Sequence, residues 1–168
     1  MRISFSKLRA SMAGQTRKDI SRCSARHPAS PPTVDLPLDA FIPGDYVSDV
    51  DTRLELYRNL GNVDAAEKLD DILKEYTDRF GTPPPEVQNL LYAVKIKGLA
   101  AKAGIESITT EEGQIIIRRF GGLPFDARTL APVLRDEISV GRTQIRIHYK
   151  KIGKGWKHIL EGVVRRIP

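Results

Sequence analysis

Residues 69–104 read LDDILKEYTDRFGTPPPEVQNLLYAVKIKGLAAKAG, and this run predicts two helices separated by a proline break. In the first part, apolar side chains recur at the spacing of one helical face, at Leu69, Ile72, Leu73, Tyr76 and Phe80. Gly81 ends this helix, and the prolines at 83–85 prevent its continuation. The next helix begins near Pro85, where a missing N–H costs nothing, and Gly104 closes it. Because its apolar surface is wider than one stripe, we expect it to be the central helix.

A further helix is expected upstream of this pair, from about Asp49 to Leu60. Ser48 or Asp49 can cap its first turn, and Gly61 supplies its stop. Asn62 then serves as the N-cap of the following helix. The buried face is predicted from the apolar residues at helical spacing, which are Val50, Leu54, Tyr57 and Leu60.

The second half of the chain changes to the period of strands. Residues 105–109 and 114–120 flank a Glu-Glu-Gly turn at 111–113 and predict a β-hairpin. Residues 143–149 alternate, and one face carries Ile145, Ile147 and Tyr149. Helices are expected over 126–137, where Pro132 is unfavourable, and over 156–166.

Another strand is expected near the start of the folded part, where apolar residues alternate at Val34, Leu36 and Leu38. Pro37 cannot donate to a neighbouring strand, which confines this strand to a sheet edge. The predicted fold class is therefore α+β, with an N-terminal three-helix subdomain followed by a small antiparallel sheet with packed helices. No apolar run approaches the ~18 residues of a membrane span. A single cysteine, Cys23, excludes an internal disulfide, so we expect a soluble, cytoplasmic protein.

Charge divides the chain into three parts. Residues 1–32 carry seven Lys/Arg against one acid, which accounts for the whole net charge of +6. These residues lack a helical or strand period, so we expect a disordered basic arm or a non-native start, with the folded domain at 33–168. An organellar presequence shares this composition but needs an apolar helical face, which the arm lacks.

The expected folded part, residues 33–168, has no net charge, but its acidic and basic residues are unevenly distributed along the chain. Residues 33–86 hold 13 acids and five bases, whereas residues 87–168 hold seven acids and 15 bases. If these segments form different faces, one side of the domain is acidic and the other is basic, an arrangement that orients a charged partner during encounter.

The usual signatures of catalysis are missing from the sequence. No phosphate-binding loop of the G-x-x-x-x-G-K-[ST] type occurs, and Gly153-Lys154-Gly155 is too short to replace one. The three histidines, His27, His148 and His158, are scattered and do not have the spacing of metal ligands. We therefore expect no cofactor, no metal and no enzymatic activity.

Two groups of charged residues remain as candidates for a non-catalytic site. The first is Glu75, Asp78 and Arg79 at the end of the second helix. Glu75 and Arg79 stand at i, i+4, so they either form an exposed intrahelical pair worth about 0.2–0.5 kcal/mol or dock against a partner's arginines. The second is a C-terminal basic cluster, from which we select Arg146, Lys150, Lys151, Lys154 and Lys157 as possible nucleic-acid contacts. Tyr149 and Trp156 interleave with it, either as stacking platforms or as core residues.

Three linked segments resemble the C-terminal domain of the bacterial transcription-repair coupling factors, the Mfd family. They are Tyr46-Val47-Ser48-Asp49 through Arg53-Leu54-Glu55-Leu56-Tyr57-Arg58, then Glu75-Tyr76-Thr77-Asp78-Arg79-Phe80-Gly81 with Val87-Gln88-Asn89-Leu90-Leu91, and finally Ala103-Gly104-Ile105. The resemblance covers about residues 35–165, and the last third matches by pattern more than by identity.

The resemblance implies a regulatory role. In this family the parent is an ATP-driven DNA translocase that displaces stalled RNA polymerase and recruits UvrA through a UvrB-like module. The C-terminal domain covers that module, hides its UvrA-binding surface and restrains the motor. Carried onto this chain, the resemblance implies a docking role for Glu75, Asp78 and Arg79. Residues 1–32 resemble no part of the helicase lobes that precede this domain in the family, so the resemblance implies that DNA is reached only through the parent motor.

Overall fold

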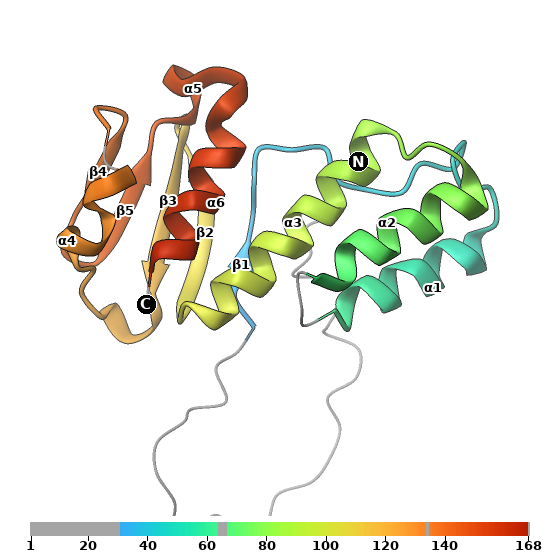
Figure 1. The fold of residues 1–168 in the computed structure, drawn as a ribbon, viewed down its shortest axis with the longest axis horizontal. Coiled ribbons are helices and arrows are strands. Elements are labelled where there is room, and N and C mark those ends of the chain that lie inside the picture. Colours follow the sequence, from blue (N-terminus) through green and yellow to red (C-terminus); the bar gives the residue numbers. More distant parts are fainter. Residues whose placement is uncertain (1–30, 64–66, 134, 168) are drawn as a thin grey trace, which may run out of the picture.

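The computed structural model describes residues 31–63, 67–133 and 135–167. A short edge strand at Thr33–Val34 comes first and three helices follow it. The other four strands of a five-stranded sheet come after the helices, and helices cover one face of that sheet (Figure 1). The sequence-based fold class, α+β with an N-terminal three-helix subdomain, is confirmed. The expected arm at 1–32 lies outside the described residues except for Pro31 and Pro32, as do Cys23 and His27.

The first subdomain contains three helices, namely α1 (Val50–Gly61), α2 (Glu67–Phe80) and the first half of α3 (Pro85–Lys102). We call these helices, together with the chain that leads into α1, the helical unit. Their bounds agree with the sequence prediction to within a few residues. Asn62 is the C-cap of α1, where its N–H donates to the carbonyls of Asn59 and Leu60. Its expected role as the N-cap of α2 stays a prediction. Residues 64–66 lie outside the described part of the chain.

The predicted buried face of α1 is half wrong. Leu60 is 1% exposed as expected, and its inward neighbour is Leu56, at 3%. Val50 and Leu54 are 57% and 45% exposed. The helix is rotated so that the N-terminal half of the predicted stripe faces solvent, because the helical unit is anchored through Leu56, Leu60 and the preceding Val47 instead.

The described residues form two hydrophobic cores, and helix α3 contributes to both of them. Its first half packs into the helical unit through Val87, Leu90, Leu91 and Val94. Its second half packs on the sheet through Ile96, Ala100 and Ala103. The wide apolar surface that the sequence predicts is thus explained by two neighbours on one helix.

The sheet has the order β1-β2-β3-β5-β4. Its strands are β1 (Thr33–Val34), β2 (Ile105–Glu111), β3 (Gln114–Arg119), β4 (Ile138–Val140) and β5 (Gln144–Ile147). The predicted hairpin β2–β3 is confirmed, and β3, β5 and β4 pair antiparallel. The edge strand β1 is shorter than predicted and joins β2 in parallel, so the sheet is mixed.

The segment predicted as one helix over 126–137 is α-helical only at its start. Asp126 caps the four-residue helix α4 (Ala127–Leu130) by accepting from the N–H of Arg128, and a 3₁₀ turn follows at Ala131–Val133. Pro132 lacks the N–H that a longer helix would need. The chain then forms β4, which the sequence analysis did not anticipate.

The chain ends with two helices, α5 (Tyr149–Ile152) and α6 (Trp156–Arg166), joined by a 3₁₀ turn at Gly153–Gly155. Helix α6 matches its prediction and packs against α3 and the sheet through Trp156, Leu160, Val163 and Val164. Tyr149, predicted as the last residue of a strand, begins α5 instead. We call the strands, the second half of α3 and helices α4–α6 the sheet unit.

Candidate functional site

The end of α2 presents the three residues that the sequence singles out. Glu75, Asp78 and Arg79 are all exposed on its last turns. The Arg79 Nη1 atom lies 2.9 Å from Glu75 Oε1, and both side chains are about half exposed, at 52% and 53%. Such a pair contributes at most about 0.5 kcal/mol to stability. Asp78 makes no ion pair with any described residue, and its side chain is exposed.

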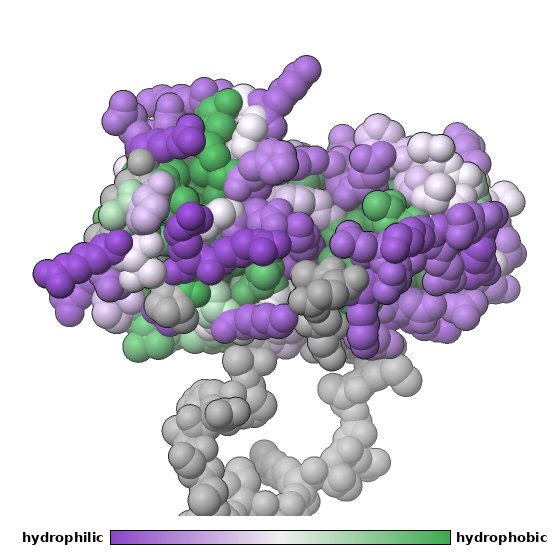
Figure 2. Space-filling model, in the orientation of Figure 1, coloured by the Kyte–Doolittle hydropathy of each residue, from purple (hydrophilic) through white to green (hydrophobic). Residues whose placement is uncertain are grey.

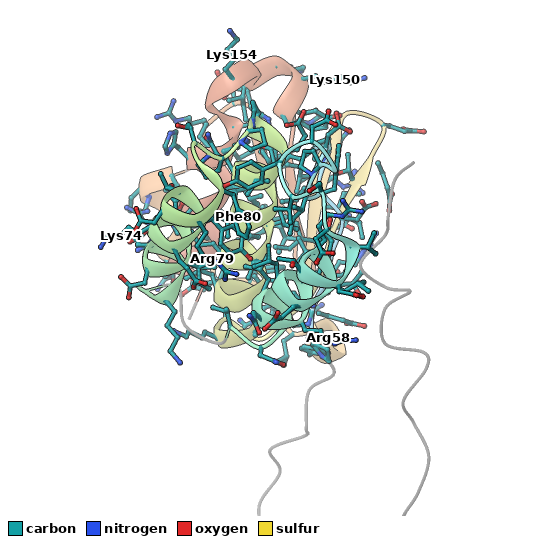
Figure 3. The ribbon with its side chains drawn as sticks, turned by 90° about the vertical axis from the view of Figure 1, so that its right-hand side faces the viewer. Arg58, Lys74, Arg79, Phe80, Lys150 and Lys154 are labelled. Carbon is teal, nitrogen blue, oxygen red and sulfur yellow. The ribbon has the colours of Figure 1, made fainter. Side chains whose placement is uncertain are left out.

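Arg79 is also held over an aromatic ring. Its guanidinium carbon lies 5.0 Å from the centroid of the Phe80 ring. That ring meets the edges of Tyr46 and Tyr76 at 5.8 Å and 6.3 Å. Figure 3 looks onto this end of the molecule, with Arg79 and Phe80 near its centre. The charged end of α2 is therefore backed by a packed aromatic cluster.

Charge separates along the molecule. The acidic segment 33–86 contains α1 and α2, which lie together at one end, whereas most of the basic segment 87–168 forms the sheet unit at the other (Figure 1). The conditional prediction of an acidic side and a basic side is thus met. On the face drawn in Figure 2, hydrophilic side chains surround small separate apolar patches, so this face offers no broad apolar surface.

The predicted basic cluster is only partly assembled. Lys150 and Lys151 lie on α5 and Lys154 on the following turn, and all three are exposed. Figure 3 shows Lys150 and Lys154 together at the top of the view. None of them forms an ion pair with a described residue. Arg146 lies on β5 beside Ile116 of β3, on the sheet face opposite the buried Ile145 and Ile147.

Lys157 differs from these three lysines because its side chain is engaged with other residues. Its Nζ donates to Asn89 Oδ1 at 2.6 Å and lies 5.5 Å from the centroid of the Tyr92 ring. The Tyr92 hydroxyl in turn donates to the Lys157 carbonyl at 2.8 Å. These contacts join α6 to α3, so Lys157 is used in holding the two units together.

The aromatic residues near the lysines face inward. Trp156 is 8% exposed and belongs to the core of the sheet unit. Tyr149 packs against it with ring centroids 5.9 Å apart. Of the two alternatives, Trp156 takes the core position, whereas Tyr149 is half-buried at the edge of that core.

No group of His, Cys, Asp and Glu that could hold a metal ion occurs among the described residues. His148 precedes α5, and the exposed His158 lies on α6. Among the described residues, no helix is both long enough and apolar enough to cross a membrane.

Two features of this region were not predicted. One is the exposure of Val50 and Leu54, which looked like core residues at helical spacing. The other is the role of Tyr46, whose hydroxyl lies 3.0 Å from the Tyr76 carbonyl oxygen and 2.9 Å from that of Gly81. No local sequence signal marks a contact between residues 35 positions apart.

Fold and surface together define a small α+β domain whose candidate site is a charged helix end. The model of the TRCF domain family matches residues 36–120, half of the chain, and the chain belongs to this family. It is 41% identical over 87 residues to the transcription-repair-coupling factor of Rickettsia bellii, and 41% identical over 75 residues to that of Staphylococcus epidermidis strain ATCC 35984. These matches cover 52% and 45% of this chain, but only 8% and 6% of the relatives.

A solved structure supports the same fold. The crystal structure of a C-terminal domain of transcription-repair coupling factor is similar with a TM-score of 0.67 and 22% sequence identity. The match covers 80% of this chain and 88% of that one. The similarity therefore extends beyond the segment that the family model matches and includes much of the sheet unit.

Proposed function

We propose that this chain is a regulatory docking domain of a transcription-repair coupling factor in transcription-coupled nucleotide excision repair. In this proposal it covers the UvrA-binding surface of the factor's UvrB-like module and thereby restrains the factor. UvrA and RNA polymerase are then indirect partners, and the chain itself is not an enzyme. The TRCF domain match gives the family context, and the observation that carries the docking role is the exposed end of α2.

Three properties of that end support docking. Asp78 has no ion-pair partner among the described residues, and Glu75 is paired only to the half-exposed Arg79. The guanidinium of Arg79 is already placed over Phe80. A partner arginine can therefore engage the carboxylates, while Arg79 turns to a partner carboxylate without leaving its aromatic support.

The test is a titration of the full chain against the isolated UvrB-like module of a coupling factor, at low and at high salt. Glu75→Arg and Asp78→Arg should each weaken binding at least tenfold, and wild-type binding should fall as salt rises. Asp70→Arg is the matched control, since it makes the same charge change on an exposed residue of the same helix that forms no ion pair with a described residue and does not stand at i, i+4 to Glu75. Equal loss in all three variants would show a general field effect, and unchanged binding in the first two would remove the site.

A second candidate function is nucleic-acid binding by the sheet unit. The observation that favours it is the exposed group of Lys150, Lys151 and Lys154, which form no ion pair with described residues. It predicts duplex binding whose salt slope falls by about one for each lysine replaced. If DNA binding disappears when residues 1–32 are deleted, it came from the basic N-terminal segment and this candidate is wrong.

A further inference from the structure

The outer face of α1 carries apolar side chains that no described residue covers. Val50 and Leu54 are 57% and 45% exposed and stand at i, i+4, which places them one above the other on adjacent turns. Five large apolar side chains are exposed in the described part of the chain, namely Phe41, Val50, Leu54, Leu73 and Leu123. Four of these five belong to the acidic helical unit.

This exposure is not the result of a loose helix end. Asp49 Oδ2 accepts from the Thr52 N–H at 2.7 Å, which caps the first turn of α1. Arg53 Nη1 donates to the carbonyl of Val47 at 2.6 Å and lies 3.2 Å from that of Ser48. The opposite side of the helix is fixed in the core by Leu56 and Leu60. The exposed pair is thus presented on a rigid element, as a binding surface requires.

The charges around the pair are mostly negative. Asp51 and Glu55 are exposed and form no ion pair with any described residue. Arg53 is turned back onto the main chain at the start of α1, so its charge is not available on the outer face. The nearest base on that face is Arg58, one turn after Leu54 and far from Arg79 in Figure 3. An apolar stripe bordered by two carboxylates matches a partner with apolar side chains flanked by Lys or Arg.

The stripe begins near the candidate docking site. The N-terminus of α1 and the C-terminus of α2 lie at the same end of the molecule (Figure 1). Tyr46, four residues before Val50, packs its ring on Phe80 at 5.8 Å. A partner seated on the end of α2 therefore needs little additional reach to contact α1.

We infer that the outer face of α1 is a second protein-docking surface, and that its occupant is a basic amphipathic helix of the partner that covers the end of α2. The inference rests on the proposed function for the identity of that partner. The apolar residues of the occupant contact Val50 and Leu54, and its Lys or Arg side chains meet Asp51 and Glu55. The mismatch between the sequence pattern and the structure at Val50 and Leu54 is then explained by this use.

The experiment measures binding of the full chain to the UvrB-like module for three variants. The double variant Val50→Ser/Leu54→Ser should bind at least tenfold more weakly, and Glu55→Lys severalfold more weakly. Leu123→Ser is the control, because Leu123 is also exposed, at 53%, but lies in the sheet unit. All three should melt within a few degrees of the wild type, since none of these side chains is buried.

The outcomes separate the inference from the proposed function. If the α1 double variant binds as the wild type does while Glu75→Arg fails to bind, the inference is wrong and the proposed function stands. If the double variant loses binding and the α2 variants do not, the α1 surface stands and the α2 site is wrong. Equal loss in Leu123→Ser would show a non-specific effect and overturn the inference.

A second measurement covers the case in which the wild type does not bind the module at all. A synthetic amphipathic Leu/Lys helical peptide is titrated into the ¹⁵N-labelled chain. Amide shifts centred on residues 50–58, and lost in the double variant, support the α1 surface even though the proposed function has failed. Shifts centred elsewhere, or no shifts, overturn it.

Discussion

The hydroxyl oxygen of Tyr46 lies 2.9 Å from the carbonyl oxygen of Gly81, which follows α2 directly. It also lies 3.0 Å from the carbonyl oxygen of Tyr76. Gly81 lies just beyond the last residue of α2, so its carbonyl has no partner within the helix and needs a donor from outside. Tyr46 supplies that donor from the segment before α1. It thereby fixes the turn that bears Asp78 and Arg79.

Tyr46→Phe should lower the free energy of unfolding by about 0.5–1.5 kcal/mol, because it removes this hydrogen bond and leaves the ring packing in place. Urea unfolding of the full chain measures the change. A variant as stable as the wild type would show that the hydroxyl contributes nothing to the end of α2.

Tyr76→Phe, unlike Tyr46→Phe, should not lower the free energy of unfolding. The Tyr76 side chain is 2% exposed, and its hydroxyl has no hydrogen-bond partner among the described residues. Burial raises the pKa of Tyr76 well above its ordinary value, so the group is neutral at all working pH values. Removing an unsatisfied buried hydroxyl should leave stability unchanged or increase it, by up to ~1 kcal/mol in the same assay. A loss as large as that of Tyr46→Phe would indicate that the Tyr76 hydroxyl has a partner, such as a buried water.

The rotation of α1 is tested by a pair of leucines six residues apart. Leu60→Ala should cost about 2–5 kcal/mol, because Leu60 is 1% exposed and its loss leaves a cavity. Leu54→Ser should change stability by about 0.5 kcal/mol or less, since Leu54 is 45% exposed. Thermal or urea unfolding of both variants distinguishes the observed rotation from the one that the sequence pattern predicts, in which both leucines are core residues.

The order and type of the main elements could be predicted because their signals are local. The apolar spacing and proline break of residues 69–104, and the turn at 111–113, specify α2, α3 and the β2–β3 hairpin. The rotation of α1 could not be predicted, because Leu54 and Leu56 are equally apolar and only tertiary packing selects between them. Strand β4 is three residues long and has no period of its own that a sequence pattern could detect.

In the candidate site, too, some features follow from the local sequence pattern and others depend on tertiary contacts. The exposed end of α2 follows from the amphipathic period, which leaves Glu75, Asp78 and Arg79 on its charged face. The engagement of Lys157 depends on Asn89, 68 residues earlier, and composition carries no information about that contact. Charge counts therefore located a basic region but could not identify which of its cations are engaged.

Lys157 and Lys151 should respond differently to the same substitution. Lys157→Met removes a charged donor from Asn89, so the free energy of unfolding should fall by about 1.5–3 kcal/mol. Lys151→Met should leave stability within about 0.5 kcal/mol, because the side chain is exposed and makes no ion pair with a described residue. Unfolding by urea measures both. Equal stability of the two variants would contradict the placement of Lys157 between α6 and α3.

Acid should weaken the contact between α3 and α6 through Glu161. Its Oε1 atom lies 2.8 Å from Lys95 Nζ and 2.7 Å from Arg165 Nη2. Partial burial alone would raise the pKa of Glu161, but the hydrogen bonds and positive charges of Lys95 and Arg165 outweigh it, so the pKa is lowered. A carboxyl group with a lowered pKa in the folded state adds stability above its unfolded pKa, near ~4.3. That stability is lost as the pH falls through the lower, folded value.

Glu161→Gln should therefore reduce the free energy of unfolding at pH 7 and flatten its decline on acidification below about pH 5. Lys95→Met removes one of the two cations that contact Glu161. It should likewise make the free energy of unfolding fall less steeply on acidification. Because both changes remove one interaction, the double variant should lose less than the sum of the single losses at pH 7, and the coupling should vanish at low pH. Urea unfolding of the four proteins at both pH values gives this cycle. Additive losses at pH 7 would mean that the Glu161–Lys95 pair, although 2.8 Å apart, does not stabilise the packing of α6 on α3.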